Sequence, residues 1–212
     1  MNKISILKKG HEEFRKIKFK ENEDRFKRLV DEGQSPKALF IGCSDSRLMP
    51  SMITGSEAGD LFVVRNIGNF VPPFKPVNDY HATASAIEYA VSVLGISDII
   101  VCGHSDCGAI KAVWQPPKPT AETIHTIKWL ELGQKAKEKA ESALPHAEQK
   151  ELLNYTEKIS VVLQLENLLT YPAVKRGVEN GSIFLHGWHY DLGNGKIEYY
   201  DEDKMLFETF TE

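Results

Sequence analysis

Three residues with reactive side chains stand at alternate positions in one short segment: Cys43, Asp45 and Arg47. They follow an apolar run at residues 38–41 that is typical of a short buried strand. Alternate residues of an extended segment share one face, so a thiol, a carboxylate and a guanidinium can point into the same space. One cysteine does not hold a metal ion alone, so the pattern predicts further ligands elsewhere in the chain.

A second pair of metal-ligand types, His104 and Cys107, follows another apolar run at residues 99–101. In an open parallel sheet the functional crevice lies beyond the carboxyl ends of the strands, so we expect Cys43 and His104 to converge there. Two thiolates and an imidazole suit zinc. Three protein ligands leave the fourth tetrahedral position open, which is typical of catalytic sites, and zinc-bound hydroxide would then form near neutral pH.

Asp45 and Arg47 have more than one interpretation. As an exposed ion pair they would contribute little. Beside an open metal position, Arg47 would hold Asp45 ionised, and Asp45 would accept the proton of the zinc-bound hydroxide and so orient its lone pair. Alternatively, Asp45 occupies the fourth metal position when its pair with Arg47 breaks.

The cysteines also have a structural interpretation. Cys43 and Cys107 could be small buried hydrophobes, as free cysteines often are. Cys102 falls within the strand expected over residues 98–103 and is predicted to be a core residue.

Length and composition bound the class of protein. The 212 residues suffice for one large α/β domain, which we expect to span residues 1–212. A net charge of −4 does not indicate a basic surface of the kind that binds nucleic acid. The apolar stretch at the amino terminus is too short for a signal peptide, and no run is long enough to span a membrane. Three cysteines without an export signal argue against disulfides and predict a cytoplasmic protein.

The order of elements predicts an α/β fold with a mostly parallel central sheet flanked by helices. Strands are expected over residues 37–42, 61–65, 98–103 and 182–186. A hairpin turn at Asn194 and Gly195 should join residues 188–192 and 196–200 as an antiparallel edge. Helices are expected from a cap at Asn78 or Asp79 to residue 94, and over residues 108–114, 121–142 and 147–170. The charged sequence of residues 1–33 predicts a helical arm that is either solvated or packed on a partner subunit.

The paired motifs at residues 43–47 and 103–108 resemble those of the β-class carbonic anhydrases. The similarity continues through residues 60–66, 86–90 and 167–172 and covers roughly residues 33–200. This resemblance implies one zinc ion per subunit, held by Cys43, His104 and Cys107, with Asp45 and Arg47 as the catalytic pair. It also implies reversible hydration of carbon dioxide to bicarbonate and a proton.

Within that class the chain resembles the plant-like subclass. Gln34 matches a glutamine that precedes the strand to the first cysteine, and Phe62 and Tyr89 match aromatic residues that line the substrate pocket. In that group these three come from the partner subunit, which implies a homodimer or a higher assembly of dimers with the site at the interface. Gly108 matches a glycine whose backbone N–H helps to bind substrate, and an apolar pocket with amide donors suits carbon dioxide.

A second subclass binds bicarbonate in a regulatory pocket, and only part of its pattern is present. Arg65 and Tyr190 match, but Phe40 stands where that subclass has tryptophan, which favours the plant-like form with an open fourth position.

His81 lies near the expected start of a helix and is the candidate proton shuttle, whereas His186 and His189 are expected to be structural. Three rival functions remain. The same scaffold can act on carbonyl sulfide or carbon disulfide, and a zinc-stabilised interaction module would need no catalysis. A nucleotide-binding domain is disfavoured because no G-x-G-x-x-G run follows the strands.

Overall fold

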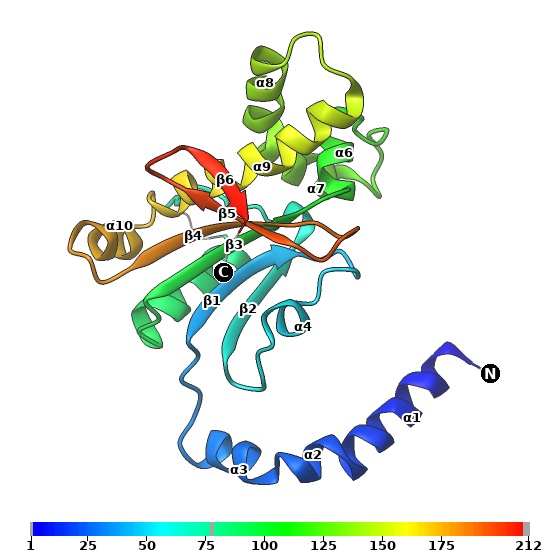
Figure 1. The fold of residues 1–212 in the computed structure, drawn as a ribbon, viewed down its shortest axis with the longest axis vertical. Helices are drawn as coiled ribbons and strands as arrows, with labels where there is room; N and C mark the ends of the chain where they lie inside the picture. The colour runs from blue at the N-terminus through cyan, green and yellow to red at the C-terminus, as the bar shows by residue number, and fades with distance from the viewer. Residues whose placement is uncertain (1, 77–78, 210–212) are drawn as a thin grey trace. The chain divides into compact units, whose positions relative to one another are not determined.

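The computed structural model describes residues 2–76 and 79–209, and these divide into two compact units between Ser35 and Pro36. The first unit contains the helices α1 (Lys3–Lys16), α2 (Lys18–Glu21) and α3 (Glu23–Asp31) (Figure 1). The segment is helical as expected, but it breaks at Ile17 and Asn22, where φ is −115° and −118°. None of the described residues in these helices is buried, and their aromatic rings pack mainly on one another.

The second unit is built on a six-stranded sheet in the order β2-β1-β3-β4-β5-β6 (Figure 1). The parallel strands are β1 (Ala38–Cys43), β2 (Leu61–Asn66), β3 (Asp98–His104) and β4 (Phe184–Tyr190). The strands β5 (Ile197–Asp201) and β6 (Leu206–Thr209) add an antiparallel edge. The α/β class, the mostly parallel sheet and the antiparallel edge are therefore confirmed, and the bounds of β1, β2 and β3 lie within one residue of those expected.

Helices cover both faces of the sheet because its central strands carry apolar residues on both sides. On one face the sheet packs against α5 (Ala82–Glu88), α9 (Gln149–Leu168) and α10 (Pro172–Glu179). On the other face lie α4 (Pro50–Thr54), α6 (Gly108–Trp114) and α7 (Ile124–Leu130), while α8 (Gln134–Ala143) packs on α9. Cys102 is fully buried in the second core, as expected.

Two expected elements are arranged differently in the second half of the chain. The strand expected at residues 182–186 and the hairpin arm at 188–192 form the single strand β4. Gly187 lies inside this strand without interrupting it. A glycine is needed there because an added Cβ would lie only 3.0 Å from Tyr200 and 3.1 Å from Leu165. The helix expected over residues 121–142 is broken near Gly133, whose added Cβ would lie 2.7 Å from Val113.

Two short α-helices, α4 and α10, and the strand β6 were not expected from the sequence, nor was the 3-10 turn Ile67–Asn69. Pro172, just beyond the helix expected over residues 147–170, occupies the first turn of α10, where proline is well tolerated.

The helix expected to start near residue 78 begins at Ala82. Asn78 lies outside the described residues, and Asp79 is not the cap. His81 caps the helix instead, because its Nδ1 accepts a hydrogen bond of 3.4 Å from the backbone N–H of Ala84. A π-helical turn, Tyr89–Val93, follows α5 and leads to Gly95, which has a φ of 68° and ends the segment as expected.

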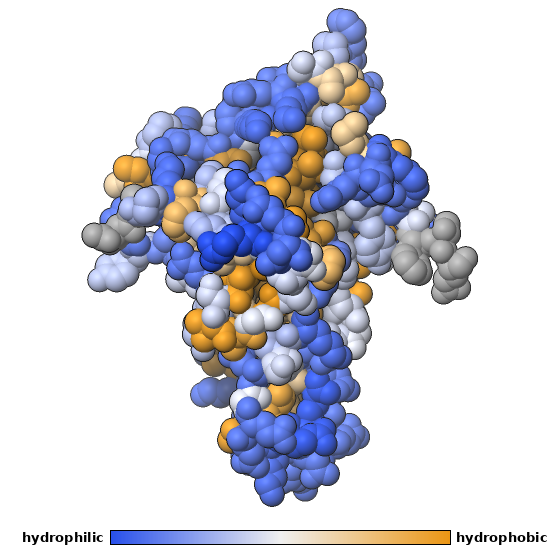
Figure 2. All heavy atoms as spheres, turned by 90° about the vertical axis from the view of Figure 1, so that its left-hand side faces the viewer, coloured by the Kyte–Doolittle hydropathy of each residue, from blue (hydrophilic) through white to orange (hydrophobic). Residues whose placement is uncertain are grey.

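The surface carries both polar and apolar side chains. On the face drawn in Figure 2, hydrophilic residues predominate and hydrophobic ones form smaller patches between them. Across the residues that the structure describes, the helices are either too short or too polar to cross a lipid bilayer.

Candidate metal centre

Three potential metal ligands meet at one edge of the sheet. Cys43 ends β1, His104 ends the neighbouring strand β3, and Cys107 follows just before α6. All three are buried, and their ligand atoms lie within 4.8 Å of one another. The structure therefore brings together the three residues that the sequence pattern selects.

The orientation of His104 fits a metal ion. Its Nδ1 lies 2.9 Å from the carbonyl oxygen of Ser105, which leaves Nε2 for a ligand. Nε2 is buried and has no hydrogen-bond partner in the part of the chain that the structure describes. An unpaired buried nitrogen is costly, and a metal ion would satisfy it. Two sulfurs and one imidazole nitrogen form a donor set that suits zinc.

The two thiols differ in acidity. Hydrogen bonding with Cys107 is the main reason that the pKa of Cys43 falls to about 4, in spite of its burial. The same interaction and burial raise the pKa of Cys107. Burial favours the neutral ring of His104, but contacts with the Cys43 sulfur and the Ser105 carbonyl outweigh it and raise the pKa of His104. Cys43 therefore has marked thiolate character, the form in which cysteine binds metals.

Asp45 and Arg47 form a bidentate pair beside the ligands. Arg47 Nε and Nη2 donate to the two carboxylate oxygens at 2.9 and 2.8 Å, and the backbone N–H of Arg47 donates at 3.0 Å. Hydrogen bonds from the Arg47 side chain hold the pKa of Asp45 well below its usual range, against a smaller effect of burial. Asp45 is therefore ionised at neutral pH, and its orientation is fixed.

Sequence reasoning missed two further contacts of this loop. Asp106 accepts from Arg47 at 2.9 Å and also pairs with Lys111, and its φ of 59° is left-handed. Its place between two ligands in the motif was a signal that could have identified it. Arg65 matches part of the bicarbonate-pocket pattern of another subclass. In the structure it donates from β2 to the carbonyl oxygens of Cys43 and Asp45 at 2.9 and 2.6 Å.

A third missed contact comes from a distant helix. Glu157 on α9 accepts a hydrogen bond of 2.9 Å from the backbone N–H of Cys107. The two residues are 50 positions apart, and no local pattern links them.

The aromatic residues expected to line the substrate pocket lie together, but away from this centre. The rings of Phe62 and Tyr89 stack with centroids 6.0 Å apart. Phe62 is opposite Leu39, four residues before Cys43 on β1. At about 3.3 Å per residue this separation is roughly 13 Å along the strand. Of the remaining pocket residues, Gly108 is adjacent to Cys107 at the start of α6, whereas Gln34 is exposed in the first unit.

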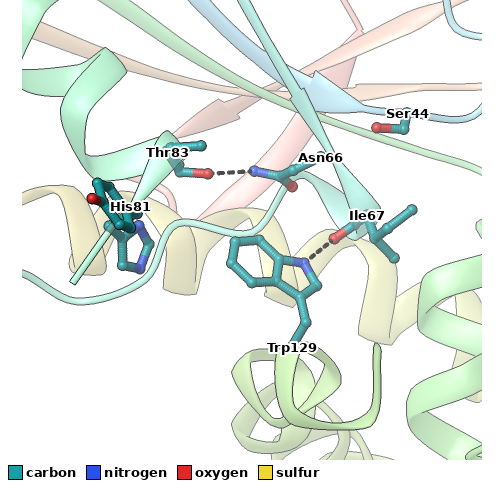
Figure 3. Close-up of a pocket in the computed structure, with 8 residues that line it drawn as sticks. Ser44, Asn66, Ile67, His81, Thr83 and Trp129 are labelled. Atoms are coloured by element: carbon teal, nitrogen blue, oxygen red, sulfur yellow. Dashed lines mark hydrogen bonds between the residues drawn. The ribbon is translucent and has the colours of Figure 1, made fainter. Parts of the chain in front are cut away.

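A cavity of about 400 Å³ is lined by the residue after the first metal ligand and by His81. Ser44, which directly follows Cys43, forms part of the cavity wall. Trp129 and Ile67 form another part of this wall, and Trp129 Nε1 donates to the carbonyl oxygen of Ile67 at 2.7 Å (Figure 3). In the view of Figure 3, Ser44 and His81 lie at opposite ends of the group of lining residues, with Thr83 and Asn66 drawn between them. The candidate proton shuttle therefore borders a cavity that reaches the residue next to a ligand.

Comparison with known proteins agrees with this geometry. Residues 38–197 match the family model for carbonic anhydrase. A carbonic anhydrase of Pseudomonas aeruginosa is 42% identical over 180 residues, which cover 84% of this chain and 80% of that protein. The solved structure of the β-carbonic anhydrase CcaA is 36% identical and superposes with a TM-score of 0.91, covering 99% of this chain and 92% of that one. The chain belongs to the β-class carbonic anhydrases.

This membership confirms the resemblance and the enzyme class expected from the motifs. The protein is a carbonic anhydrase, a lyase of a zinc-dependent family. A chloroplastic β-carbonic anhydrase of Arabidopsis thaliana is 35% identical over 190 residues, covering 90% of this chain and 62% of that protein. A structure that describes tetrameric β-carbonic anhydrases of Sordaria macrospora is 28% identical with a TM-score of 0.82, covering 94% of this chain and 97% of that one.

Proposed function

We propose that this carbonic anhydrase hydrates carbon dioxide reversibly to bicarbonate and a proton, with one zinc ion per subunit held by Cys43, His104 and Cys107. The observation that carries the proposal is the meeting of three buried ligand atoms within 4.8 Å, with Nε2 of His104 otherwise unpartnered in the described chain. Zinc in such a site acts as a Lewis acid that makes a hydroxide nucleophile available near pH 7.

Asp45 has the role of orienting the nucleophile. As an ionised carboxylate it would accept a hydrogen bond from the hydroxide nucleophile and so direct the lone pair of the hydroxide oxygen toward carbon dioxide. This contribution is one of geometry rather than of proton removal. Three donors from Arg47 hold the carboxylate of Asp45, so this carboxylate would not be free to serve as a further metal ligand. The backbone N–H of Gly108, next to Cys107, is the donor for the charge that develops on substrate oxygen.

His81 is the residue through which the product proton leaves. It borders the cavity that begins at Ser44. Its Nδ1 accepts the capping hydrogen bond from Ala84, so Nε2 carries the proton of the neutral ring. A product proton taken up at Nδ1 would release this cap, and the ring would then pass the Nε2 proton to solvent.

The working unit is a homodimer or a higher assembly of dimers, in which Gln34, Phe62 and Tyr89 complete the site of the partner subunit. The roughly 13 Å between Phe62 and its own Cys43 supports this arrangement. Exposed apolar side chains close to this pair in sequence, Val63 at 45% and Val93 at 64%, suit an interface. We place the enzyme in the cytoplasm, in agreement with its three free cysteines.

Two variants test the assigned roles. Asp45→Ala should retain one zinc per chain and lose most hydration activity, whereas Cys43→Ala should lose both. Zinc is measured by atomic emission and hydration by stopped flow with a pH indicator. Glu202→Ala, which removes an exposed carboxylate in the turn after β5, is the matched control and should be fully active. A fully active Asp45→Ala enzyme would refute the orienting role.

The same preparations separate the rival functions. Full zinc without hydration, but with turnover of carbonyl sulfide or carbon disulfide, would assign the scaffold to those substrates. Full zinc without turnover of any of them would favour the interaction module.

A further inference from the structure

A buried carboxylate that the mechanism does not use lies behind the metal ligands. Glu157 on α9 is only 5% exposed, and its Oε1 accepts from the backbone N–H of Cys107 at 2.9 Å. Burying a carboxylate is costly unless it is paired and hydrogen-bonded. The position of Glu157 therefore requires partners that hold it there.

His189 and then Glu198 lie between Glu157 and the surface, at contact distances rather than in hydrogen bonds. His189 on β4 is 1% exposed, and its Nε2 lies 3.5 Å from Oε2 of Glu157. Its Nδ1 lies 3.5 Å from Glu198 on β5, which pairs with Lys158 at 2.7 Å. The two oxygens of Glu157 thus have different neighbours, the Cys107 amide on one side and His189 on the other.

The amide that Glu157 binds belongs to an irregular part of the backbone. Cys107 is the N-cap of α6, so its N–H lies outside the hydrogen-bonding pattern of the helix. Asp106, just before it, has a left-handed φ of 59°, a conformation that surrounding contacts must maintain in a non-glycine residue. Arg47 and Lys111 hold the Asp106 side chain, and Glu157 holds the following N–H.

We propose that Glu157 is a positioning residue of the metal centre. By accepting the Cys107 N–H it fixes the direction in which the Cys107 side chain leaves the backbone, so that the third ligand is preformed. The proposal rests on the zinc site proposed above. Outer-shell partners of this kind typically change metal affinity about 10- to 100-fold.

The role requires a hydrogen-bond acceptor of the right reach, and this requirement separates the conservative variants. Glu157→Gln keeps the length and the acceptor, and its amide NH2 can donate to His189. Glu157→Asp keeps the charge but withdraws the acceptor by one methylene. Glu157→Leu removes the acceptor and keeps the volume. A positioning role therefore predicts that Gln substitutes for Glu157 better than Asp does.

The matched control is Gln164→Leu on the same helix. Gln164 is fully buried and accepts from the backbone N–H of Val71 at 2.8 Å, so this variant also removes a buried acceptor for a backbone amide. The amide that it frees is not next to a metal ligand.

The measurement is the rate of zinc release from zinc-loaded full-length protein to a colorimetric chelator. We expect Glu157→Asp and Glu157→Leu to release zinc about 10- to 100-fold faster than wild type, and Glu157→Gln and Gln164→Leu to stay within about threefold. The thiolate-to-metal absorption of the cobalt(II)-substituted proteins should change in Glu157→Asp and remain unchanged in Glu157→Gln. If Glu157→Leu does not fold, the comparison of Asp with Gln decides.

The proposal is overturned if Glu157→Asp releases zinc as slowly as wild type, or if Glu157→Gln releases it as fast as Glu157→Asp. A different result would contradict the zinc site itself: wild type that holds no zinc, or Cys43→Ala that holds it as tightly as wild type. The two failures are therefore distinguishable.

Discussion

Gly103 lies in β3 immediately before His104, where the strand packs against α9. A Cβ at this position would lie 2.7 Å from Cγ2 of Val161, which is fully buried. This distance is about 0.7 Å short of ordinary van der Waals contact, so Gly103→Ala requires β3 or α9 to move. Both elements carry residues of the metal centre, His104 on β3 and Glu157 on α9.

The size of the effect follows from this contact. Overpacking of a rigid core costs about 1–3 kcal/mol, and we expect Gly103→Ala to lower the free energy of unfolding by about 2 kcal/mol. Val161→Ala should cost about 1–2.5 kcal/mol by itself. In the double variant the clashing methyl group is gone, and the nearest remaining neighbour is the backbone oxygen of Glu157 at 3.6 Å, an ordinary contact. The double variant should therefore be destabilised by at least about 1 kcal/mol less than the sum of the two single variants.

Urea denaturation of the wild type, both single variants and the double variant, each free of metal, gives the four free energies. Zinc release from the loaded proteins gives a second readout, which should be faster in Gly103→Ala and recover in the double variant. Strictly additive free energies, or a Gly103→Ala protein as stable as wild type, would refute the reasoning that β3 and α9 pack too closely for a side chain at position 103.

Three further predictions concern other parts of the molecule. Arg47→Leu removes the group that lowers the pKa of Asp45 and should therefore lower the free energy of unfolding, measured in urea on metal-free protein. This loss should be complete above about pH 5 and should shrink as the pH falls below the usual carboxyl pKa of 3.8. An equal loss at pH 2.5 and pH 7 would contradict the assigned cause. Tyr171→Phe removes a buried hydrogen bond of 2.9 Å to the carbonyl oxygen of Pro72 and should cost about 1–2 kcal/mol in the same assay, whereas unchanged stability would show that the bond contributes nothing. Phe62→Ala should shift the protein toward monomer in sedimentation velocity at micromolar concentration, and an unchanged dimer would remove Phe62 from the interface.

The metal ligands were predictable because their signals are local. Apolar runs before Cys43 and His104 mark strand ends, and parallel strands place such ends at one edge of a sheet. The spacing of Cys43, Asp45 and Arg47 likewise indicated that they act together, and the structure pairs Asp45 with Arg47.

The supporting residues were not predictable in the same way, because tertiary packing creates their contacts. Glu157 is one of several polar residues on a long helix, and only the position of α9 brings it to Cys107. Arg65 matched a known pattern, but its hydrogen bonds to the loop after β1 depend on the β1–β2 register. The break near Gly133 has the same origin, since contacts with Val113 and Phe70 leave no room for a side chain.

Stopped-flow hydration of carbon dioxide between about pH 6.5 and 9, on protein of known zinc content, tests the central claim most directly. We predict fast turnover with about one zinc per chain and a rate that rises with pH through a single ionisation near neutrality. Asp45 should add no further step in this range, because Arg47 keeps it ionised. Full zinc with no turnover at any pH would contradict the account.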